Sequence, residues 1–288
     1  MEKSKKVSRF LYKIFEKIKR IFVFLYLIFF NLFSQNKIIS EDSEVVVTLT
    51  SHSDRILRAF AAIESIGIGT LQPQKIILYL GNTYADKPLP SNLERLKRRG
   101  LEVAFCNDIG PHTKYFPYVQ SKSFFDGPLV TADDDKMYEK DWLAKLVQAW
   151  KSEPNHVHCF RARKIIIENG NFAAYKSWPL CTDTHPSFLN FATGVSGVIY
   201  PAKLLECIKS TGLDFLERCP KADDIWLHVI AIRNGFKIRQ LQSESKHFFG
   251  TPGSSKSALH LSNLSGGDND TQISQTYNLG DLQILANE

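Results

Sequence analysis

The sequence lacks the cysteine patterns that are typical of disulfide-rich and zinc-binding proteins. Its five cysteines are an odd number, and no two of them form a C-x-x-C pair. The chain has 288 residues, 43% of them hydrophobic, which is ample to bury a core without covalent cross-links. These features argue against a disulfide framework or a zinc site, and they fit a reducing compartment.

Three common catalytic motifs are also missing. The chain has no G-x-x-x-x-G-K-[ST] phosphate loop, no H-E-x-x-H zinc motif and no G-x-S-x-G nucleophile motif. Nucleotide binding of the phosphate-loop type is therefore excluded. Internal repeats and long low-complexity stretches are missing as well.

Outside its N-terminus the chain lacks an excess of charge of either sign. The formal net charge is +6, and residues 1–20, with eight basic and two acidic residues, account for all of it. The remaining chain has 28 basic and 28 acidic residues. The basic pI therefore describes a tail, and it gives no support for nucleic acid as a partner or for a nuclease.

The sequence also lacks an apolar run of ordinary membrane-spanning length. Residues 21–30 (IFVFLYLIFF) are apolar, or 21–33 if Asn31 is tolerated, whereas a span needs roughly 20 such residues. No small-residue cleavage site follows, which argues against a signal peptide. We interpret residues 1–35 as a helix that anchors the protein on an anionic membrane surface. A buried core helix and a short true span are the alternatives.

The rest of the chain divides into a polar linker, residues 36–44, and one catalytic domain, residues 45–288. In that domain short β-branched runs alternate with segments of helical spacing. Strands are expected at 45–51, 75–80, 101–106 and 128–133, and helices at 56–66, 92–99, 141–150 and 222–234. This alternation predicts an α/β fold with a mostly parallel central sheet, in which ligands bind beyond the carboxyl ends of the strands.

Three consecutive aspartates, Asp133, Asp134 and Asp135, follow the fourth expected strand. Adjacent like charges are costly unless a positive group lies among them. Mn²⁺ or Mg²⁺, held by one or two carboxylates and completed by phosphate oxygens and water, satisfies that need. Strand alternation places Asp133 and Asp135 on one side and Asp134 on the other. A solvated acidic loop is the alternative.

A second acidic pair, Asp223 and Asp224, stands at the start of a later helix, where acidic side chains stabilise the helix dipole by themselves. The two acidic groups belong to an ordered series of segments: TLTSHSDR, GPHTKYF, TADDD, TGVSGVIYP, CPKADDIW and ALHLSNLSGGDNDTQ. This series resembles bacterial glycosyltransferases of the GT-A fold, of the family-two-like kind that build surface polysaccharides such as lipopolysaccharide or capsule. The resemblance covers roughly residues 45–275, and its specificity comes from order and spacing.

The resemblance implies roles for both acidic groups. TADDD matches the D-x-D motif, which makes Asp135 the direct metal ligand and places Asp133 near the ribose or the metal. ADD matches the x-E-D motif, whose last acid is the base in inverting members, so Asp224 is the expected base with Asp223 beside it. A late histidine often completes the metal site, and here His247 is the candidate and His260 its competitor.

The resemblance also implies a donor site. Its expected residues come from the first nucleotide-contacting loop, from the segment that supplies a basic side chain, and from the aspartate triplet: Thr50, Ser51, His52, Arg55, Lys114, Asp133 and Asp134. Many members of the family carry an acid after the second strand to bind the nucleotide base. This chain has YLGNT there, so the resemblance leaves the base open.

Two further residues are candidates for the acceptor site. Gly194, in TGVSGVIYP, permits close approach of backbone to a substrate, although an ordinary packed turn is the alternative. Trp226 offers a ring for stacking on a sugar, as does Trp178, although tryptophan belongs more often to the core. If Asp224 is the base, it accepts the proton of the attacking acceptor hydroxyl; a retaining enzyme would not need it in this role.

These observations predict a metal-dependent glycosyltransferase at the cytoplasmic face of a bacterial inner membrane. It would move a sugar from a nucleotide-sugar donor to a glycan or glycolipid acceptor. A metal-dependent phosphohydrolase or nucleotidyltransferase using the same acids is one alternative. A non-catalytic glycan-binding protein on the same fold is another, and it would have no need of Asp224.

Overall fold

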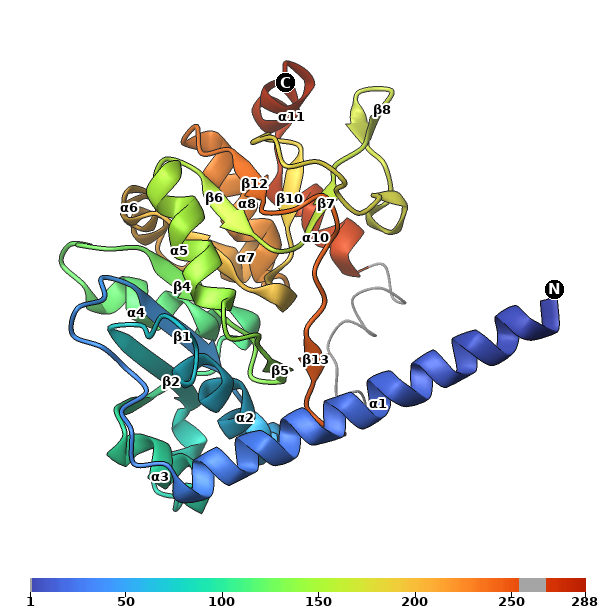
Figure 1. Cartoon of the computed structure of the whole chain (residues 1–288). Coiled ribbons are helices and arrows are strands. Elements are labelled where there is room, and N and C mark those ends of the chain that lie inside the picture. Colours follow the sequence, from blue (N-terminus) through green and yellow to red (C-terminus); the bar gives the residue numbers. More distant parts are fainter. Residues whose placement is uncertain (1, 254–267) are drawn as a thin grey trace.

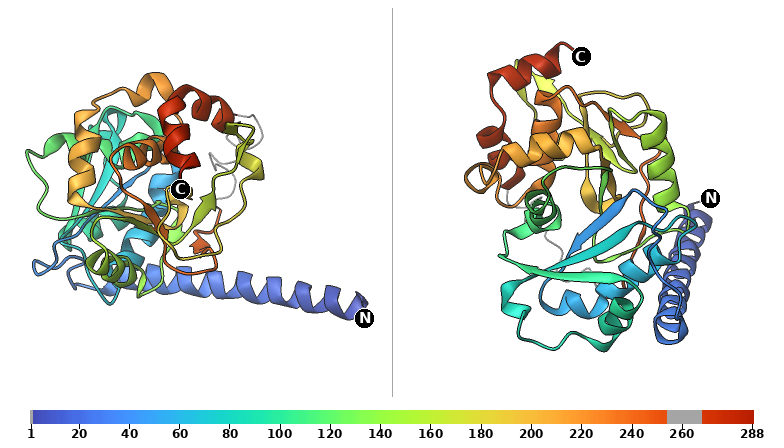
Figure 2. Two further views of the ribbon diagram at one scale, coloured as in Figure 1. Left: turned by 90° about the horizontal axis from the view of Figure 1, so that it is seen from above. Right: turned by 90° about the vertical axis from the view of Figure 1, so that its left-hand side faces the viewer.

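The computed structural model describes the backbone of residues 2–253 and 268–288, and the side chains of these ranges from residue 11 onward. A central sheet is covered by helices on both faces (Figures 1 and 2). The helices are α1 (Glu2–Phe33), α2 (Ile56–Gly67), α3 (Ser91–Arg98), α4 (Phe116–Ser121), α5 (Trp142–Ser152), α6 (Ala202–Ser210), α7 (Phe215–Arg218), α8 (Asp223–Arg233), α10 (Asp268–Thr276) and α11 (Leu279–Ala286). The strands are β1 (Val46–Thr50), β2 (Lys75–Gly81), β3 (Leu101–Cys106), β4 (Leu129–Thr131), β5 (Lys136–Met137), β6 (Val157–Cys159), β7 (Ala162–Lys164), β8 (Ile167–Glu168), β9 (Asn171–Phe172), β10 (Asn190–Ala192), β11 (Val198–Tyr200), β12 (Ile238–Gln240) and β13 (Phe249–Gly250).

The main sheet has seven strands in the order β12-β6-β11-β4-β1-β2-β3. Strand β11 runs antiparallel to both of its neighbours, and the other pairs in the sheet are parallel. The predicted α/β class with a mostly parallel sheet is therefore confirmed. Short antiparallel pairs, β7 with β10 and β5 with β13, lie beside this sheet.

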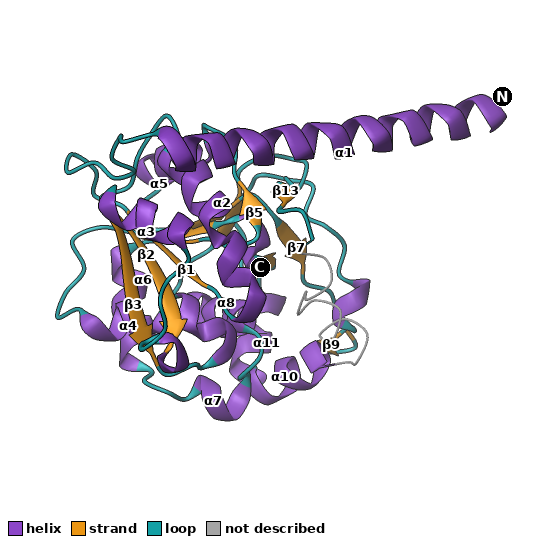
Figure 3. Cartoon of the chain, turned by 90° about the horizontal axis from the view of Figure 1, so that it is seen from below, coloured by secondary structure: helices purple, strands orange, loops and turns teal. Residues whose placement is uncertain are grey.

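Strand β1 explains why the sheet forms at the centre of the molecule. Its side chains alternate between two apolar layers, because Val46 faces one layer while Val47 and Leu49 face the other. A strand that is buried on both faces must be apolar throughout, as this one is. Helices α1, α2, α3 and α5 cover one face, and α4, α6, α8, α10 and α11 lie on the other side (Figure 3).

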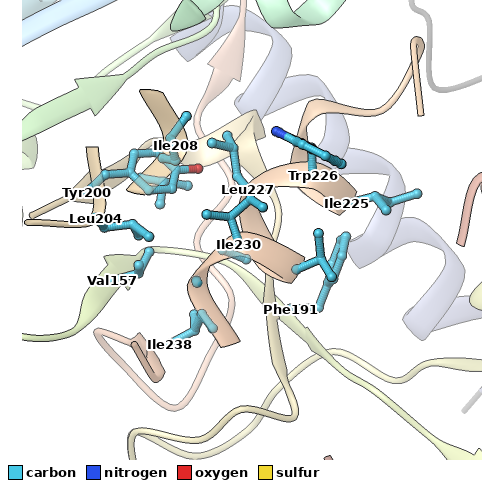
Figure 4. Packing of buried hydrophobic residues seen from close by; sticks show 14 of the residues in the cluster. Val157, Phe191, Tyr200, Leu204, Ile208, Ile225, Trp226, Leu227, Ile230 and Ile238 are labelled. Atoms are coloured by element: carbon cyan, nitrogen blue, oxygen red, sulfur yellow. The ribbon is translucent and has the colours of Figure 1, made fainter. Parts of the chain in front are cut away.

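Helix α8 is the centre of the second layer. Figure 4 shows Leu227 and Ile230 of α8 among side chains from β6, β11 and β12, including Val157, Tyr200 and Ile238. The helix is buried on nearly every side from Ile225 to Ile232. This packing fixes the position of the N-terminus of α8, where the second acidic pair lies.

Helix α1 packs on α2 and α3 through the C-terminal half of its length, and its N-terminal half extends beyond the rest of the chain (Figures 1 and 2). Leu27 and Asn31 are buried in this contact. The Asn31 side chain donates to the carbonyl of Asn92 at 3.0 Å and accepts from Arg95 Nε at 2.9 Å. Among the described residues, no helix has the length and apolarity that a membrane span requires.

The segment expected to be a linker, residues 36–44, packs on the domain. Ile38 is completely buried. Arg99 donates to the Asn36 carbonyl at 2.7 Å and forms a buried ion pair with Glu64 of α2, also at 2.7 Å. Burial raises the pKa of Glu64 and Arg99 opposes that shift. The polar composition of this stretch predicted a linker and did not reveal these anchors.

Candidate functional site

A cavity of about 410 Å³ lies where β1 and β4 end, against the N-terminus of α8. Carboxyl ends of parallel strands are the expected location of a ligand site in this class of fold. The site residues expected from the sequence that line the cavity are Thr50, His52, Arg55, Lys114, Asp133, Asp134, Asp135, Gly194, Asp223, Asp224 and His247. Ser51 and Trp226 do not line it, and His260 lies outside the described residues.

The loop after β1 holds the middle aspartate of the triplet. The Asp134 side chain is 3% exposed. It accepts hydrogen bonds from the guanidinium of Arg55, and from the hydroxyl of Ser51 at 2.5 Å. Ser51 is itself buried, so its expected contact with a donor is replaced by a contact with Asp134. Thr50 donates its hydroxyl proton to the carbonyl of Tyr79, which ties the same loop to β2.

Lys114 connects the two acidic groups. Its Nζ lies 2.8 Å from Asp133 Oδ1 and 3.5 Å from Asp223 Oδ2, and the residue is only 8% exposed. Burial by itself would lower the pKa of Lys114, but the carboxylates of Asp133, Asp223 and Asp224 outweigh it and raise that pKa. Lys114 is therefore a permanent cation between the triplet and α8.

His112 positions Lys114 two residues later in the same segment. One nitrogen of its buried ring lies 2.8 Å from the Tyr115 hydroxyl, and the other lies 2.8 Å from the carbonyl of Cys219, just before α8. The ring also stacks on Phe215 with a centroid distance of 4.1 Å. Burial is the main cause that lowers the pKa of His112, so the ring stays neutral and makes these contacts at neutral pH.

Asp224 differs from the other cavity acids in its surroundings. Its Oδ1 accepts the backbone N–H of Gly194 at 3.0 Å, and in the described part of the chain no basic side chain forms an ion pair with it. Burial, followed by the charge of Asp223, raises the pKa of Asp224 to about 8. A Cβ on Gly194 would lie 3.0 Å from the same carboxylate oxygen, so glycine permits this close approach. A carboxylate that opens onto a cavity with a raised pKa is suited to accept a proton.

The expected metal ligands lie on the cavity wall but do not form a complete site. No three His, Cys, Asp or Glu side chains of the described residues are grouped closely enough to hold a metal ion. Asp133 forms an ion pair with Lys114. Burial and the charge of Asp133 raise the pKa of Asp135, although the charges of Lys136 and Arg55 oppose that rise. Burial and nearby cations lower the pKa of His247, so its ring is neutral. One carboxylate and one neutral imidazole fit a Mg²⁺ or Mn²⁺ ion that takes its other ligands from phosphate and water.

The expected role of Trp226 in acceptor binding is wrong. Trp226 is 2% exposed and belongs to the buried hydrophobic cluster shown in Figure 4. Its ring lies against Phe215, at a centroid distance of 6.3 Å. Trp178 is 1% exposed and is also a core residue. The alternative of a core tryptophan therefore applies to both, because burying these large rings stabilises the fold more than leaving them at the surface.

The structure adds cavity residues that the sequence analysis missed. Arg161, just before β7, and Arg163, within β7, line it together with Tyr175, and Lys136 enters it from β5. The signal for the two arginines was their spacing in FRARK, because side chains two residues apart in an extended segment share a face. Nothing local indicated that this face would meet the aspartates, which lie about thirty residues earlier.

Comparisons with known proteins bear on the fold alone. No family model and no curated protein matches the chain. Solved structures with a similar chain trace include 4-diphosphocytidyl-2C-methyl-D-erythritol synthase from Anaerococcus prevotii, at 11% identity and a TM-score of 0.49, covering 77% of this chain and 95% of that one. TarS 1–349 of S. aureus shows 13% identity and a TM-score of 0.47, covering 84% of this chain and 69% of that one. The inositol-1-phosphate CTP transferase from T. maritima shows 9% identity and a TM-score of 0.44, covering 79% of this chain and 97% of that one. At such values function has to be argued from the cavity itself.

Proposed function

We propose that the protein is a glycosyltransferase that moves a sugar from a nucleotide-sugar donor to a hydroxyl group of a glycan or glycolipid. One observation carries the proposal. Acidic and basic side chains form a cluster in the cavity, and a separate carboxylate, Asp224, lies next to it with a raised pKa. The first feature suits a diphosphate and the second suits removal of a hydroxyl proton, and glycosyl transfer from a nucleotide sugar needs both.

The donor half of the site is the end of β1 together with the aspartate triplet. His52 and Arg55 line this part of the cavity, and Lys114 lies between the triplet and α8. Preorganised cations of this kind stabilise the negative charge that grows on a departing diphosphate. Asp135 and His247 would hold Mn²⁺ or Mg²⁺, which when bound neutralises part of that charge. Lys114 and Arg55 keep the carboxylates around the metal ion in place.

The acceptor half is the N-terminus of α8. Asp224 would accept the proton of the acceptor hydroxyl as its oxygen attacks the anomeric carbon, whose bond to the diphosphate oxygen breaks. The Gly194 N–H, 3.0 Å from Asp224 Oδ1, orients the carboxylate. Asp223 is held by Lys114 instead and has a positioning role. An attack on the face opposite to the diphosphate makes the enzyme inverting.

Nucleotidyl transfer is the second candidate, and the same cluster of acids and bases favours it. The two reactions differ in their products. A glycosyltransferase converts a nucleotide sugar to a nucleoside diphosphate, whereas a nucleotidyltransferase releases pyrophosphate from a nucleoside triphosphate. Incubation with panels of both substrate classes, scored for both products, separates them.

Helix α1 supports a location at the surface of a membrane. Twelve large apolar side chains between Leu11 and Phe33 are exposed on it, although the helix packs on the domain through Leu27 and Asn31. The basic residues Lys13, Lys17 and Arg20 lie along the same helix. Such a combination suits an interface between headgroups and acyl chains. A membrane-bound glycolipid of the cell surface is the acceptor that this placement favours.

The test of the proposed function is Asp224→Asn, with Asp223→Asn as the matched control on the neighbouring residue. The amide keeps the size of the side chain and removes its basicity. We expect nucleotide-sugar binding to be kept and kcat to fall about 10²–10⁴-fold in Asp224→Asn. Asp223→Asn should lose less. Full transfer activity in Asp224→Asn would refute the assigned base, and failure of every nucleotide sugar to bind would refute the proposed function.

A further inference from the structure

The cavity holds more basic than acidic side chains, and the surplus is concentrated at one place. Six basic side chains line it, against five carboxylates: Arg55, Lys114, Lys136, Arg161, Arg163 and Lys221, against Asp133, Asp134, Asp135, Asp223 and Asp224. The triplet aspartates pair with Lys114, Arg55 and Lys136. In the described part of the chain, Arg161 and Arg163 make no ion pair, and Asp224 lies beyond ion-pair distance of both.

The contacts of Arg161 leave part of its guanidinium free. Its Nη1 donates to the Thr193 hydroxyl at 2.7 Å, and its Nε is buried with no hydrogen-bond partner among the described residues. Thr193 precedes Gly194, which bonds to Asp224, so Arg161 belongs to the side of the cavity where the acceptor is expected. Burial lowers the pKa of Arg161, and the neighbouring charge of Arg163 lowers it further. An anion placed there would relieve both costs.

Arg163 is held in position beside it. Its guanidinium carbon lies 5.2 Å from the centre of the Tyr175 ring, and Nη1 donates to the carbonyl of Trp178. These contacts fix the plane of the guanidinium without neutralising its charge. Two arginines that line the same cavity, each with donors to spare, match the geometry of phosphate and carboxylate groups.

We propose that Arg161 and Arg163 bind an anionic group of the acceptor, a phosphate or a carboxylate, so that the enzyme acts on a negatively charged glycan. This inference rests on the proposed function, because that function places the acceptor on the Asp224 side. It adds a substrate class, because a neutral acceptor would leave the two half-buried arginines without an ion pair. The diphosphate of the donor is served by Lys114 and Arg55, the cations that pair with Asp133 and Asp134.

The test is a binding measurement with the donor site filled. A nucleoside diphosphate that binds the full-length protein is first added to saturation, together with Mn²⁺, so that it occupies the Lys114 side. Glucose 6-phosphate, glucuronate and neutral glucose are then titrated, and their Kd values are obtained by ligand-observed NMR. We expect both anionic sugars to bind at least tenfold more tightly than glucose. Tighter binding of glucose 6-phosphate assigns a phosphate group, and tighter binding of glucuronate assigns a carboxylate group.

The variants are Arg161→Gln and Arg163→Gln, and the matched control is Arg218→Gln on the exposed end of α7. The two cavity variants should weaken binding of the anionic sugars about tenfold and leave glucose and the nucleoside diphosphate unchanged. Arg218→Gln should change none of them. Equal affinity of the wild type for glucose and both anionic sugars overturns the inference, even if the variants do not fold. A cavity variant that weakens only the binding of the nucleoside diphosphate also overturns the inference. If no nucleoside diphosphate binds, the proposed function fails first.

Discussion

Lys114→Met removes the cation that the buried acids of the cavity share while it keeps the length of the side chain. In the wild type Nζ pairs with Asp133 at 2.8 Å and with Asp223 at 3.5 Å, and it opposes the rise in the pKa of Asp224. The variant leaves these carboxylates close together without that charge. We expect a clear loss in the free energy of unfolding at pH 7.

The size of the loss follows from burial. Removing one partner of a buried ion pair costs about 3–5 kcal/mol, because the other charge stays buried and uncompensated. The Lys114 side chain is 11% exposed and that of Asp133 is 22% exposed, so water compensates part of the loss. We therefore expect the lower end of the range, about 3 kcal/mol at pH 7.

The loss should depend on pH in a defined direction. Burial alone would raise the pKa of Asp133, but Lys114 outweighs it and holds that pKa below its usual value. In the wild type Asp133 therefore adds stability above its unfolded pKa, and the gain is lost as the pH falls through the lower folded pKa. In Lys114→Met only Lys136 and Arg55 still oppose burial, so we expect burial to raise the folded pKa above the unfolded one and stability to be lost as the pH increases. The difference between the two proteins must then shrink from pH 7 towards pH 4.

Urea unfolding followed by circular dichroism at pH 7 and pH 4.5 measures this difference. The matched control is Lys145→Met, which breaks a surface pair with Asp141 at 2.6 Å, in which both side chains are 47% exposed. Such surface pairs contribute about 0–1 kcal/mol. A loss in Lys114→Met no larger than that of the control, or an equal loss at both pH values, would refute the role given to Lys114.

Three further predictions concern the base, the metal and the helix. Burial raises the pKa of Asp224 to about 8, and Asp224 can accept a proton only in its ionised form. We therefore expect kcat/KM to rise with pH and to level off above about pH 8. A flat profile from pH 6 to 9 would contradict this. Because the described residues hold no group of three metal-ligating side chains, Mn²⁺ should raise the unfolding temperature only when a nucleoside diphosphate is present. Asp135→Ala should abolish that joint effect, and stabilisation by Mn²⁺ alone would contradict the prediction. The double variant Phe15→Glu/Phe22→Glu places charges on the exposed apolar face of α1 and should release the protein from anionic vesicles in a co-sedimentation assay. Dimerisation of the wild type without vesicle binding would count against a membrane role.

The strands of the sheet could be predicted from the sequence because each is defined by a local apolar run. The expected strand 101–106 coincides with β3. The expected strand 45–51 is longer than β1 by one residue at each end, and the expected strand 75–80 is shorter than β2 by one residue. Burial on both faces requires uninterrupted apolar residues, which is a strong local signal. The edge at which the aspartates lie follows from the direction of the strands, so this part of the site was also predictable.

The contents of the cavity away from the aspartates could not be predicted in the same way. Trp226 was misassigned because α8 is apolar on nearly all sides, so no amphipathic pattern distinguishes a core face from a ligand face. Ser51 was expected in the donor site because the resemblance matched the whole loop after β1, but its hydroxyl turns inward to Asp134. Arg161 and Arg163 reach the cavity through the packing of β7 on β10, which depends on residues far apart in the chain.

The aspartate triplet is tolerable in this fold because each carboxylate faces a cation from a different part of the chain. Lys114 precedes α4, Arg55 precedes α2 and Lys136 begins β5. Since all three cations are engaged by acids, a diphosphate that enters this cluster must displace a carboxylate or bring a cation of its own. The second route keeps the ion pairs and avoids leaving a buried charge unpaired. Arg161 and Arg163 form an ion pair with no carboxylate of the described residues, so an anionic group of a second substrate can bind there directly.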